Sequence, residues 1–142
     1  MNRGLIAKVS ITIHAPTDKV WDALTKPELI KQYLFGTEVS TDWKVGSPIT
    51  YRGIWQGKIY EDKGKIVEVE VGKRLVSTYW SSMGGKADTS ENYNTVAYEL
   101  GSEGESTRLT LTQSNIVTEA EREHSEKNWT TTLEGLKKLL EG

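Results

Sequence analysis

The chain is 142 residues long, carries a net charge of −2 and has a pI of about 5.8. Its basic and acidic residues are interspersed, so it lacks the clustered basic face with which proteins bind nucleic acids. The lack of cysteine excludes disulfides, thiolate catalysis and cysteine-ligated metals. No segment approaches the roughly 20 apolar residues that span a bilayer, so we expect a single cytoplasmic domain over residues 1–142, without membrane insertion.

The first part of the chain predicts one strand followed by two short helices. Apolar and polar residues alternate over Val9–Ile13, as in a half-buried strand. The segment Lys19–Leu24 has the pattern of a helix with one apolar side. Thr25 and Glu28 have the spacing of a capping box, and Pro27 falls within the first turn, where proline is tolerated. We therefore predict a second helix that starts at Thr25.

Between Thr37 and Ile116 the hydrophobic pattern changes to a period of two, which is typical of strands. Short links rich in glycine separate the strands, so neighbours are expected to pair as antiparallel hairpins. Gly64 lies inside the longest strand and indicates a bulge or a sharp bend there. The predicted strands are Glu38–Thr41, Ile49–Trp55, Lys58–Val71, Leu75–Ser82, Tyr93–Leu100 and Arg108–Ile116.

The last segment predicts a long amphipathic helix. Thr118 and Glu121 form a second capping-box pattern, and the helix is expected to run to about Leu140. A strand, two short helices, a run of antiparallel strands and one long helix make an α+β fold. We expect a curved antiparallel sheet wrapped around the C-terminal helix, with the two short helices closing one end. The apolar face of the long helix carries Trp129, Leu133, Leu136 and Leu140.

Several short motifs, in their order and spacing, also carry a family resemblance. They are Ala15-Pro16, Val20-Trp21, Ala23-Leu24-Thr25, Pro27-Glu28-Leu29, Val45-Gly46, Arg74-Leu75, Thr107-Arg108-Leu109-Thr110-Leu111, and Trp129 with Leu133 and Leu136. With these motifs, essentially the whole chain resembles the helix-grip proteins of the START-like (SRPBCC) superfamily. It is most similar to the family named for the activator of the ninety-kilodalton heat-shock protein ATPase. Two departures are Ser47-Pro48, where the family usually has a second glycine and a polar residue, and Gln113, where a histidine is common.

The resemblance implies a cavity between the sheet and the long helix, in which relatives bind lipids, sterols or flat polyketide-like molecules. The composition suits such a cavity, because five Trp and six Tyr stand against one Phe, and Trp and Tyr rings carry a polar group. Strand alternation places three tyrosines and Gln113 in step with core residues, and three tryptophans could form apolar walls. Simple core packing is the alternative for these aromatics, and we favour it for Trp21 and Trp129. The candidate ligand-binding residues are Tyr51, Trp55, Tyr60, Trp80, Tyr98, Gln113 and Trp129.

The sequence offers little sign of chemistry. His14 and His124 are the only histidines and form no ligand cluster, so we expect neither a metal nor a cofactor. No nucleophile elbow or phosphate-binding loop is present. Asp62 shares strand parity with Tyr60 and could act as an acid or base, although a solvated charge near the bend is the favoured interpretation. We assign no catalytic residue.

Three functions are consistent with these features. The leading hypothesis is a non-catalytic binding protein for a small hydrophobic or amphipathic molecule, either lipid-like or aromatic and polyketide-like. An enzyme of the cyclase or hydrolase type would use the same cavity. A co-chaperone-like domain that contacts a heat-shock ATPase is suggested by the family resemblance, while the sequence itself identifies no protein partner.

Overall fold

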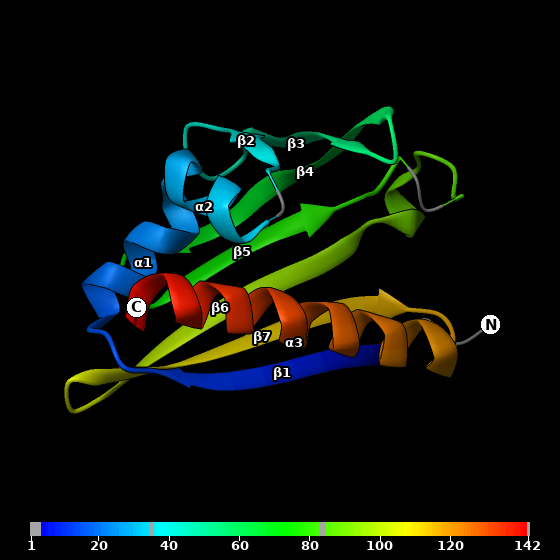
Figure 1. Cartoon of the computed structure of the whole chain (residues 1–142). Coiled ribbons are helices and arrows are strands. Elements are labelled where there is room, and N and C mark those ends of the chain that lie inside the picture. The colour runs from blue at the N-terminus through cyan, green and yellow to red at the C-terminus, as the bar shows by residue number, and fades with distance from the viewer. Residues whose placement is uncertain (1–3, 35, 83–84, 142) are drawn as a thin grey trace.

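The computed structural model of the protein describes residues 4–34, 36–82 and 85–141 (Figure 1). A strand comes first, then two short helices, six further strands and a long final helix. The strands are β1 (Leu5–Ile13), β2 (Glu38–Ser40), β3 (Pro48–Trp55), β4 (Lys58–Glu70), β5 (Arg74–Tyr79), β6 (Asn94–Glu103) and β7 (Ser106–Ile116). The helices are α1 (Thr17–Thr25), α2 (Pro27–Tyr33) and α3 (Glu119–Glu141), with a short 3-10 turn, η1 (Ser90–Asn92).

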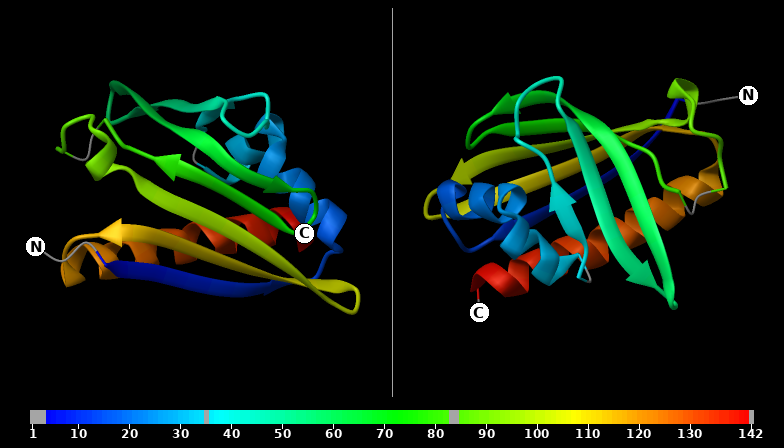
Figure 2. Two further views of the ribbon diagram at one scale, coloured as in Figure 1. Left: turned by 180° about the vertical axis from the view of Figure 1, so that it is seen from behind. Right: turned by 90° about the horizontal axis from the view of Figure 1, so that it is seen from above.

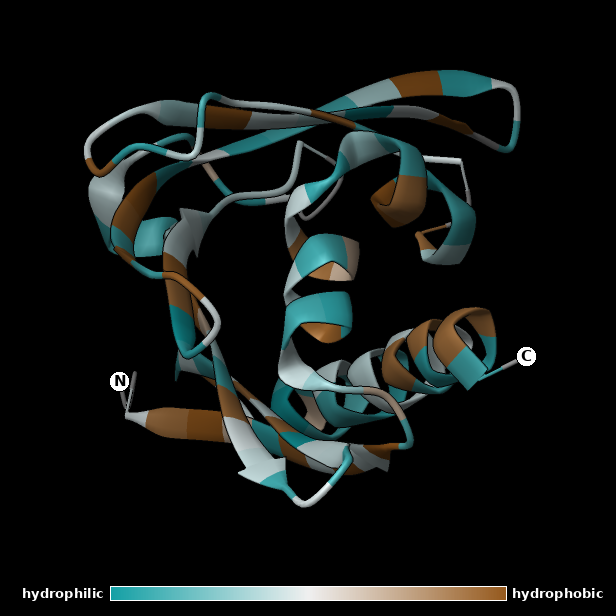
Figure 3. Cartoon of the chain, turned by 90° about the vertical axis from the view of Figure 1, so that its left-hand side faces the viewer, coloured by the Kyte–Doolittle hydropathy of each residue, from teal (hydrophilic) through white to brown (hydrophobic). Residues whose placement is uncertain are grey.

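The strands form one antiparallel, seven-stranded sheet in the order β1-β7-β6-β5-β4-β3-β2. Figures 1 and 2 show the sheet curling around α3, while α1 and α2 lead the chain from β1 at one edge of the sheet to β2 at the other. Figure 3 shows strands banded with hydrophobic and hydrophilic residues, as alternation requires of a sheet with one buried face. The predicted α+β class and the wrapping of the sheet around the C-terminal helix are confirmed.

The junction between the two short helices differs from the sequence prediction. Thr25 is the last residue of α1, and its hydroxyl donates to the carbonyl of Trp21 at 2.9 Å instead of capping the next helix. Lys26 is the N-cap of α2 and makes no side-chain capping bond. Pro27 occupies the first helical position, where a missing N–H costs nothing. The predicted capping box at Thr25 is therefore wrong, although the break between the helices falls where expected.

The start of α3 agrees better with its predicted cap. The Thr118 hydroxyl accepts a hydrogen bond from the backbone N–H of Glu121 at 3.1 Å, which is the first half of a capping box. The Glu121 carboxylate contacts the ammonium of Lys86 at 3.4 Å. The N-terminus of α3 is thus tied both to its own cap and to the segment that precedes η1.

The hydrophobic core lies where α1, α2 and the C-terminal half of α3 meet the sheet. In α3 the buried residues all follow Asn128, so the C-terminal half of this helix packs tightly and its first half does not. None of the helices within the described ranges is long and apolar enough to cross a membrane. The largest fully buried side chains are Ile13, Val20, Ile66, Thr107, Leu109, Leu111, Leu133 and Leu136.

The strand pair β4–β5 is irregular around Gly64, as predicted for this region. A Cβ atom on Gly64 would lie 1.7 Å from the carbonyl oxygen of Thr78, so only glycine allows the two strands to approach this closely. The Lys65 N–H donates to the Thr78 hydroxyl at 2.9 Å. The register shift itself lies further on, between Ile66 and Glu68. Gly64 therefore marks the close approach, and the bulge follows it.

Replacing Gly64 by alanine should destabilise the protein by about 3 kcal/mol, because the added methyl group forces the backbone of β5 to move. Urea denaturation measures the loss. Gly101→Ala is the matched control, since Gly101 also lies in a strand but no atom comes within 4 Å of its added Cβ. Its effect should stay within about 0.5 kcal/mol. Equal stabilities for the two variants would show that the β4–β5 approach is looser than described.

Candidate functional site

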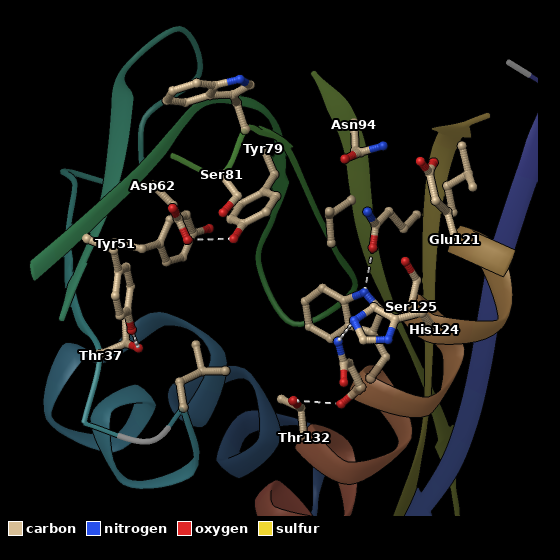
Figure 4. Close-up of a pocket in the computed structure, with 18 of the residues that line it drawn as sticks. Thr37, Tyr51, Asp62, Tyr79, Ser81, Asn94, Glu121, His124, Ser125 and Thr132 are labelled. Atoms are coloured by element: carbon tan, nitrogen blue, oxygen red, sulfur yellow. Dashed lines mark hydrogen bonds between the residues drawn. The ribbon is translucent and has the colours of Figure 1, made fainter. Parts of the chain in front are cut away.

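A pocket of about 660 Å³ lies between the inner face of the sheet and the N-terminal half of α3 (Figure 4). Strands β3 to β7 supply one side, α3 supplies the other, and the segment between α2 and β2 contributes Leu34 and Thr37. Small-molecule sites typically have volumes of about 300–1,000 Å³, so the pocket has the size of a ligand site. It occupies the region that the loosely packed half of α3 leaves open.

The structure brings most of the predicted site residues together. The side chain of Trp55 lies outside the described part of the structure, so its predicted role is left open. That the others bind a ligand stays a prediction, but they come from β3 to β7 and α3 and face one space. The six that line the pocket are Tyr51, Tyr60, Trp80, Tyr98, Gln113 and Trp129.

Trp129 joins the helix side of the pocket to the sheet side. Its indole N–H donates to the side-chain oxygen of Gln113 at 2.7 Å, and its ring meets Tyr98 edge-on, with 6.2 Å between the ring centroids. Trp129 is half-buried, packs against the core and also lines the pocket, so simple core packing describes only part of its surroundings. For Trp21 the interpretation of core packing agrees with the structure, because this residue is 8% exposed and is one of the buried residues of α1.

Three tyrosine hydroxyls of the pocket, those of Tyr51, Tyr79 and Tyr98, remain protonated at neutral pH. Burial raises the pKa of Tyr51 to about 12; the charge of Asp62 also raises this pKa, while a hydrogen bond with Ser77 lowers it. Burial likewise raises the pKa of Tyr79 and that of Tyr98. The phenol groups of these residues are therefore neutral hydrogen-bonding groups and cannot serve as bases near neutral pH.

Tyr60 and Tyr51 are held by contacts with their neighbours. The Tyr60 hydroxyl lies 2.6 Å from the hydroxyl of Thr37, and its ring covers Gly53, where an added Cβ would lie 2.5 Å from the Tyr60 oxygen. Tyr51 meets Tyr79 edge-on, with 5.6 Å between the ring centroids. Edge-on pairs of this kind stabilise each other beyond simple burial. These contacts fix the aromatic side chains along the sheet wall of the pocket.

Asp62 is buried, with 7% of its surface exposed, which corrects the interpretation of a solvated charge. Its Oδ2 accepts a hydrogen bond from the Tyr79 hydroxyl at 2.6 Å (Figure 4). Its Oδ1 accepts hydrogen bonds from the backbone N–H and the hydroxyl of Ser82, at 3.0 and 3.3 Å. The bend in β4–β5 brings these donors to the carboxylate. Gly64 indicates a bend in the sequence but not which side chains the bend brings to the carboxylate, so the partners of Asp62 were missed.

Sequence reasoning also missed the polar side of α3 that faces the pocket. Its members have the helical spacings of four, three and four residues, in phase with the buried leucines further along, and this periodicity could have identified them. Tyr79 could likewise have been found, because it shares strand parity with buried Leu75 and Ser77. The helix residues at these spacings are Glu121, Ser125, Asn128 and Thr132.

The two histidines lie far apart. The side chain of His124 is 3.1 Å from the amide nitrogen of Asn128 on the pocket side of α3, whereas the backbone of His14 is bonded to Glu141 at the other end of the helix. The 17 residues from His124 to Glu141 span about 25 Å of helix. Within the described residues, no group of three or more His, Cys, Asp or Glu side chains could hold a metal ion.

A comparison with known protein families tests the family resemblance that the sequence motifs carry. Residues 14–141 match the family described as Activator of Hsp90 ATPase homolog 1-like protein. The chain belongs to this family. Membership of the Hsp90 ATPase activator homologue family confirms the resemblance seen in the sequence, and it fits the helix-grip architecture of the sheet and α3. A comparison with curated proteins gave no match.

Solved structures show the same fold. The protein is 49% identical to ChR145 from Cytophaga hutchinsonii. The two structures have a TM-score of 0.86, and the match covers 99% of this chain and 97% of ChR145. The Aha1 dimer from Colwellia psychrerythraea is 21% identical, with a TM-score of 0.77 over 96% of both chains. DynU16, a protein of the dynemicin biosynthetic locus, is 22% identical, with a TM-score of 0.80 over 96% of this chain and 47% of that one. The last two likenesses concern the fold alone.

Trp129→Ala should reduce the free energy of unfolding by about 3 kcal/mol, the lower end for tryptophan truncation, because the side chain is only half-buried. Urea denaturation followed by circular dichroism measures the loss. Lys127→Ala on the exposed side of α3 is the control and should change stability by less than about 0.5 kcal/mol. A Trp129→Ala protein as stable as this control would contradict the described packing of α3 on the sheet.

Tyr51→Phe should make the protein less sensitive to alkali. Between pH 10 and 12 the unfolded chain loses the Tyr51 proton while the folded protein keeps it, because its pKa is raised from 10.0 to about 12. This one tyrosine should therefore lower stability by about 1.4 kcal/mol per pH unit as pH rises through that range. Urea denaturation at pH 8 to 11.5 should give a shallower alkaline slope for Tyr51→Phe and parallel curves below pH 9. Parallel curves throughout would contradict the burial of the Tyr51 hydroxyl.

Proposed function

We propose that the protein is a cytoplasmic, single-domain binding protein for a small hydrophobic or amphipathic molecule, lipid-like or aromatic and polyketide-like. Membership of the family and the fold shared with a protein of the dynemicin locus support a ligand-binding domain in general. The observation that carries the proposal is the pocket of about 660 Å³ between the sheet and α3, whose walls combine aromatic rings with neutral polar groups.

The size and polarity of the pocket favour an occupant. A dry apolar void of 660 Å³ would cost about 16 kcal/mol at ~24 cal/mol per Å³, as much as the whole stability of a domain or more. Polar groups such as Tyr60, Gln113 and Asn94 let water occupy the space instead. A ligand with an apolar body and a few polar atoms would displace that water and contact the aromatic walls.

Titrations followed by NMR test the proposal, with lauric acid, cholesterol sulfate and naringenin as probes of the three ligand classes. We expect at least one to shift the backbone signals of Tyr51 and Tyr98 and the indole signal of Trp129. Val71 on the outside of the molecule should not respond. Silence at all three pocket residues with all three probes would count decisively against a pocket for lipids, sterols or flavonoids.

A pocket-filling variant sharpens this test. Ser125 lies on the pocket side of α3, and Ser125→Trp should abolish binding by occupying the space. Glu123→Trp introduces the same side chain on the exposed side of the helix and should bind as the wild type does. Undiminished binding by a folded Ser125→Trp protein would place the probe elsewhere on the molecule.

One observation favours the enzyme alternative. The hydrogen bond between Tyr79 and Asp62 lies inside the pocket and could serve acid–base chemistry of a cyclase or hydrolase type. However, Asp62 already accepts three hydrogen bonds. The raised pKa of Tyr79 also means that its hydroxyl does not readily give up a proton near neutral pH. Turnover of a bound compound that is lost in Asp62→Asn or Tyr60→Phe would favour an enzyme. The co-chaperone alternative rests on the family description alone and stays a prediction.

A further inference from the structure

The charge of Asp62 has no countercharge in the described part of the protein. Its three hydrogen-bond donors, the hydroxyl of Tyr79 and the N–H and hydroxyl of Ser82, are all neutral. Among the residues that the structure describes, no lysine, arginine or histidine nitrogen forms an ion pair with it within 4 Å. Neutral donors satisfy the oxygen atoms but leave the net charge in place, and a buried charge without a partner is costly.

The lysine next to Asp62 in the chain and the lysine that lines the pocket are engaged with other acids. The Lys63 ammonium lies 2.5 Å from a carboxylate oxygen of Asp88 and 5.7 Å from the centroid of the Trp80 ring. The Lys86 ammonium pairs with Glu121 at 3.4 Å, on the rim of the pocket. Both pairs are internally neutral, so neither supplies the positive charge that would balance Asp62.

The carboxylate also has room for one more donor. An ionised carboxylate offers about four acceptor positions, and three are in use at Asp62. Among the described residues, the hydrogen bond that Oδ2 accepts comes from the Tyr79 hydroxyl, and Asp62 lines the pocket. In Figure 4 it lies on the sheet side, across the open space from Ser125 and His124 of α3.

The surroundings of Asp62 suit a cation. Its negative charge adds to burial in raising the pKa of both Tyr51 and Tyr79, so the field of the carboxylate reaches the aromatic wall. The same field would stabilise a positive charge placed there. Tyrosine rings such as this pair also attract cations through their faces.

We propose that the ligand of this pocket carries a protonated nitrogen, an amine or amidine on an aromatic or amphipathic body, and that this nitrogen pairs with Asp62. The inference rests on the proposed binding function and narrows it to cationic ligands. The nitrogen donates to Oδ2 of Asp62, the apolar body lies against Tyr51, Tyr98 and Trp129, and the rest of the molecule extends toward the polar side of α3.

Three probes of one shape test this inference, namely 2-naphthylmethylamine, 2-naphthylmethanol and 2-naphthoate at pH 7. They share a ring system and differ in head-group charge. A charge-assisted hydrogen bond should make the amine bind at least about tenfold more tightly than the alcohol, with the naphthoate weakest. Isothermal titration calorimetry gives the three dissociation constants, and NMR shifts at Tyr51 and Trp129 place the probe in the pocket.

Asp62→Asn keeps the shape of the side chain and removes its charge. It should abolish the amine's advantage over the alcohol. Glu61→Gln is the matched control, because Glu61 is the exposed neighbour of Asp62 in β4 and its loss changes the net charge equally. The amine's advantage should survive in this control. An advantage that persists in Asp62→Asn, or that is lost equally in Glu61→Gln, overturns the inference.

A second variant covers the case in which Asp62→Asn fails to fold. Tyr79→Phe keeps the carboxylate and removes one neutral donor, so the amine should retain at least its tenfold advantage. Loss of that advantage in a folded Tyr79→Phe protein overturns the inference. If the alcohol binds wild type as tightly as the amine does, the binding function stands and the cationic class fails. If none of the three probes binds, this inference falls, whereas the binding function is judged on the lipid, sterol and flavonoid titrations.

Discussion

The uneven packing of α3 is the constraint on which the rest of the structure depends. Leu133 and Leu136 are completely buried against the sheet, and they hold the C-terminal half of the helix to the core. The N-terminal half carries polar residues. It reaches the sheet through Trp129, whose ring meets Tyr98, and through Glu126, which accepts a hydrogen bond from the Lys8 N–H of β1. Because the buried residues of α3 begin only at Thr132, space remains beside the first half of the helix. The pocket is therefore a direct result of where the apolar residues of one helix stop.

Polar groups in the pocket wall lower the free-energy cost of that space, because water can occupy it. Among the described residues, no buried side-chain nitrogen or oxygen lacks a hydrogen-bond partner. Tyr60 is satisfied by Thr37, Trp129 by Gln113, and Tyr79 by Asp62. Each of these bonds joins two segments that are separate in the fold, so they tie the parts of the wall to one another. Asp62 differs from the other members, because hydrogen bonding satisfies its oxygens without balancing its charge.

Local periodicity predicted the fold and much of the pocket wall, and it failed where distant backbone geometry decides the outcome. Alternation along β3, β6 and β7 placed Tyr51, Tyr98 and Gln113 correctly, because these strands are regular there. Asp62 was misjudged because its partners depend on how β4 bends against β5, a feature that alternation does not encode. The cap predicted at Thr25 failed for a similar reason. A capping-box spacing does not specify which backbone group the threonine hydroxyl will contact. Here the Thr25 hydroxyl donates to the Trp21 carbonyl within α1 and does not cap α2.

The pairing of β1 with β7 limits how early in synthesis the sheet can finish folding. The strand made first pairs with the strand made last, with Val9 opposite Leu111, and α3 contacts both. Contacts this distant in sequence slow folding, because a long loop must close before they form. During synthesis the inner face of β3 to β6 must wait, uncovered, until the last quarter of the chain has left the ribosome. A nascent chain of this kind keeps apolar strand faces exposed until its final helix has been made.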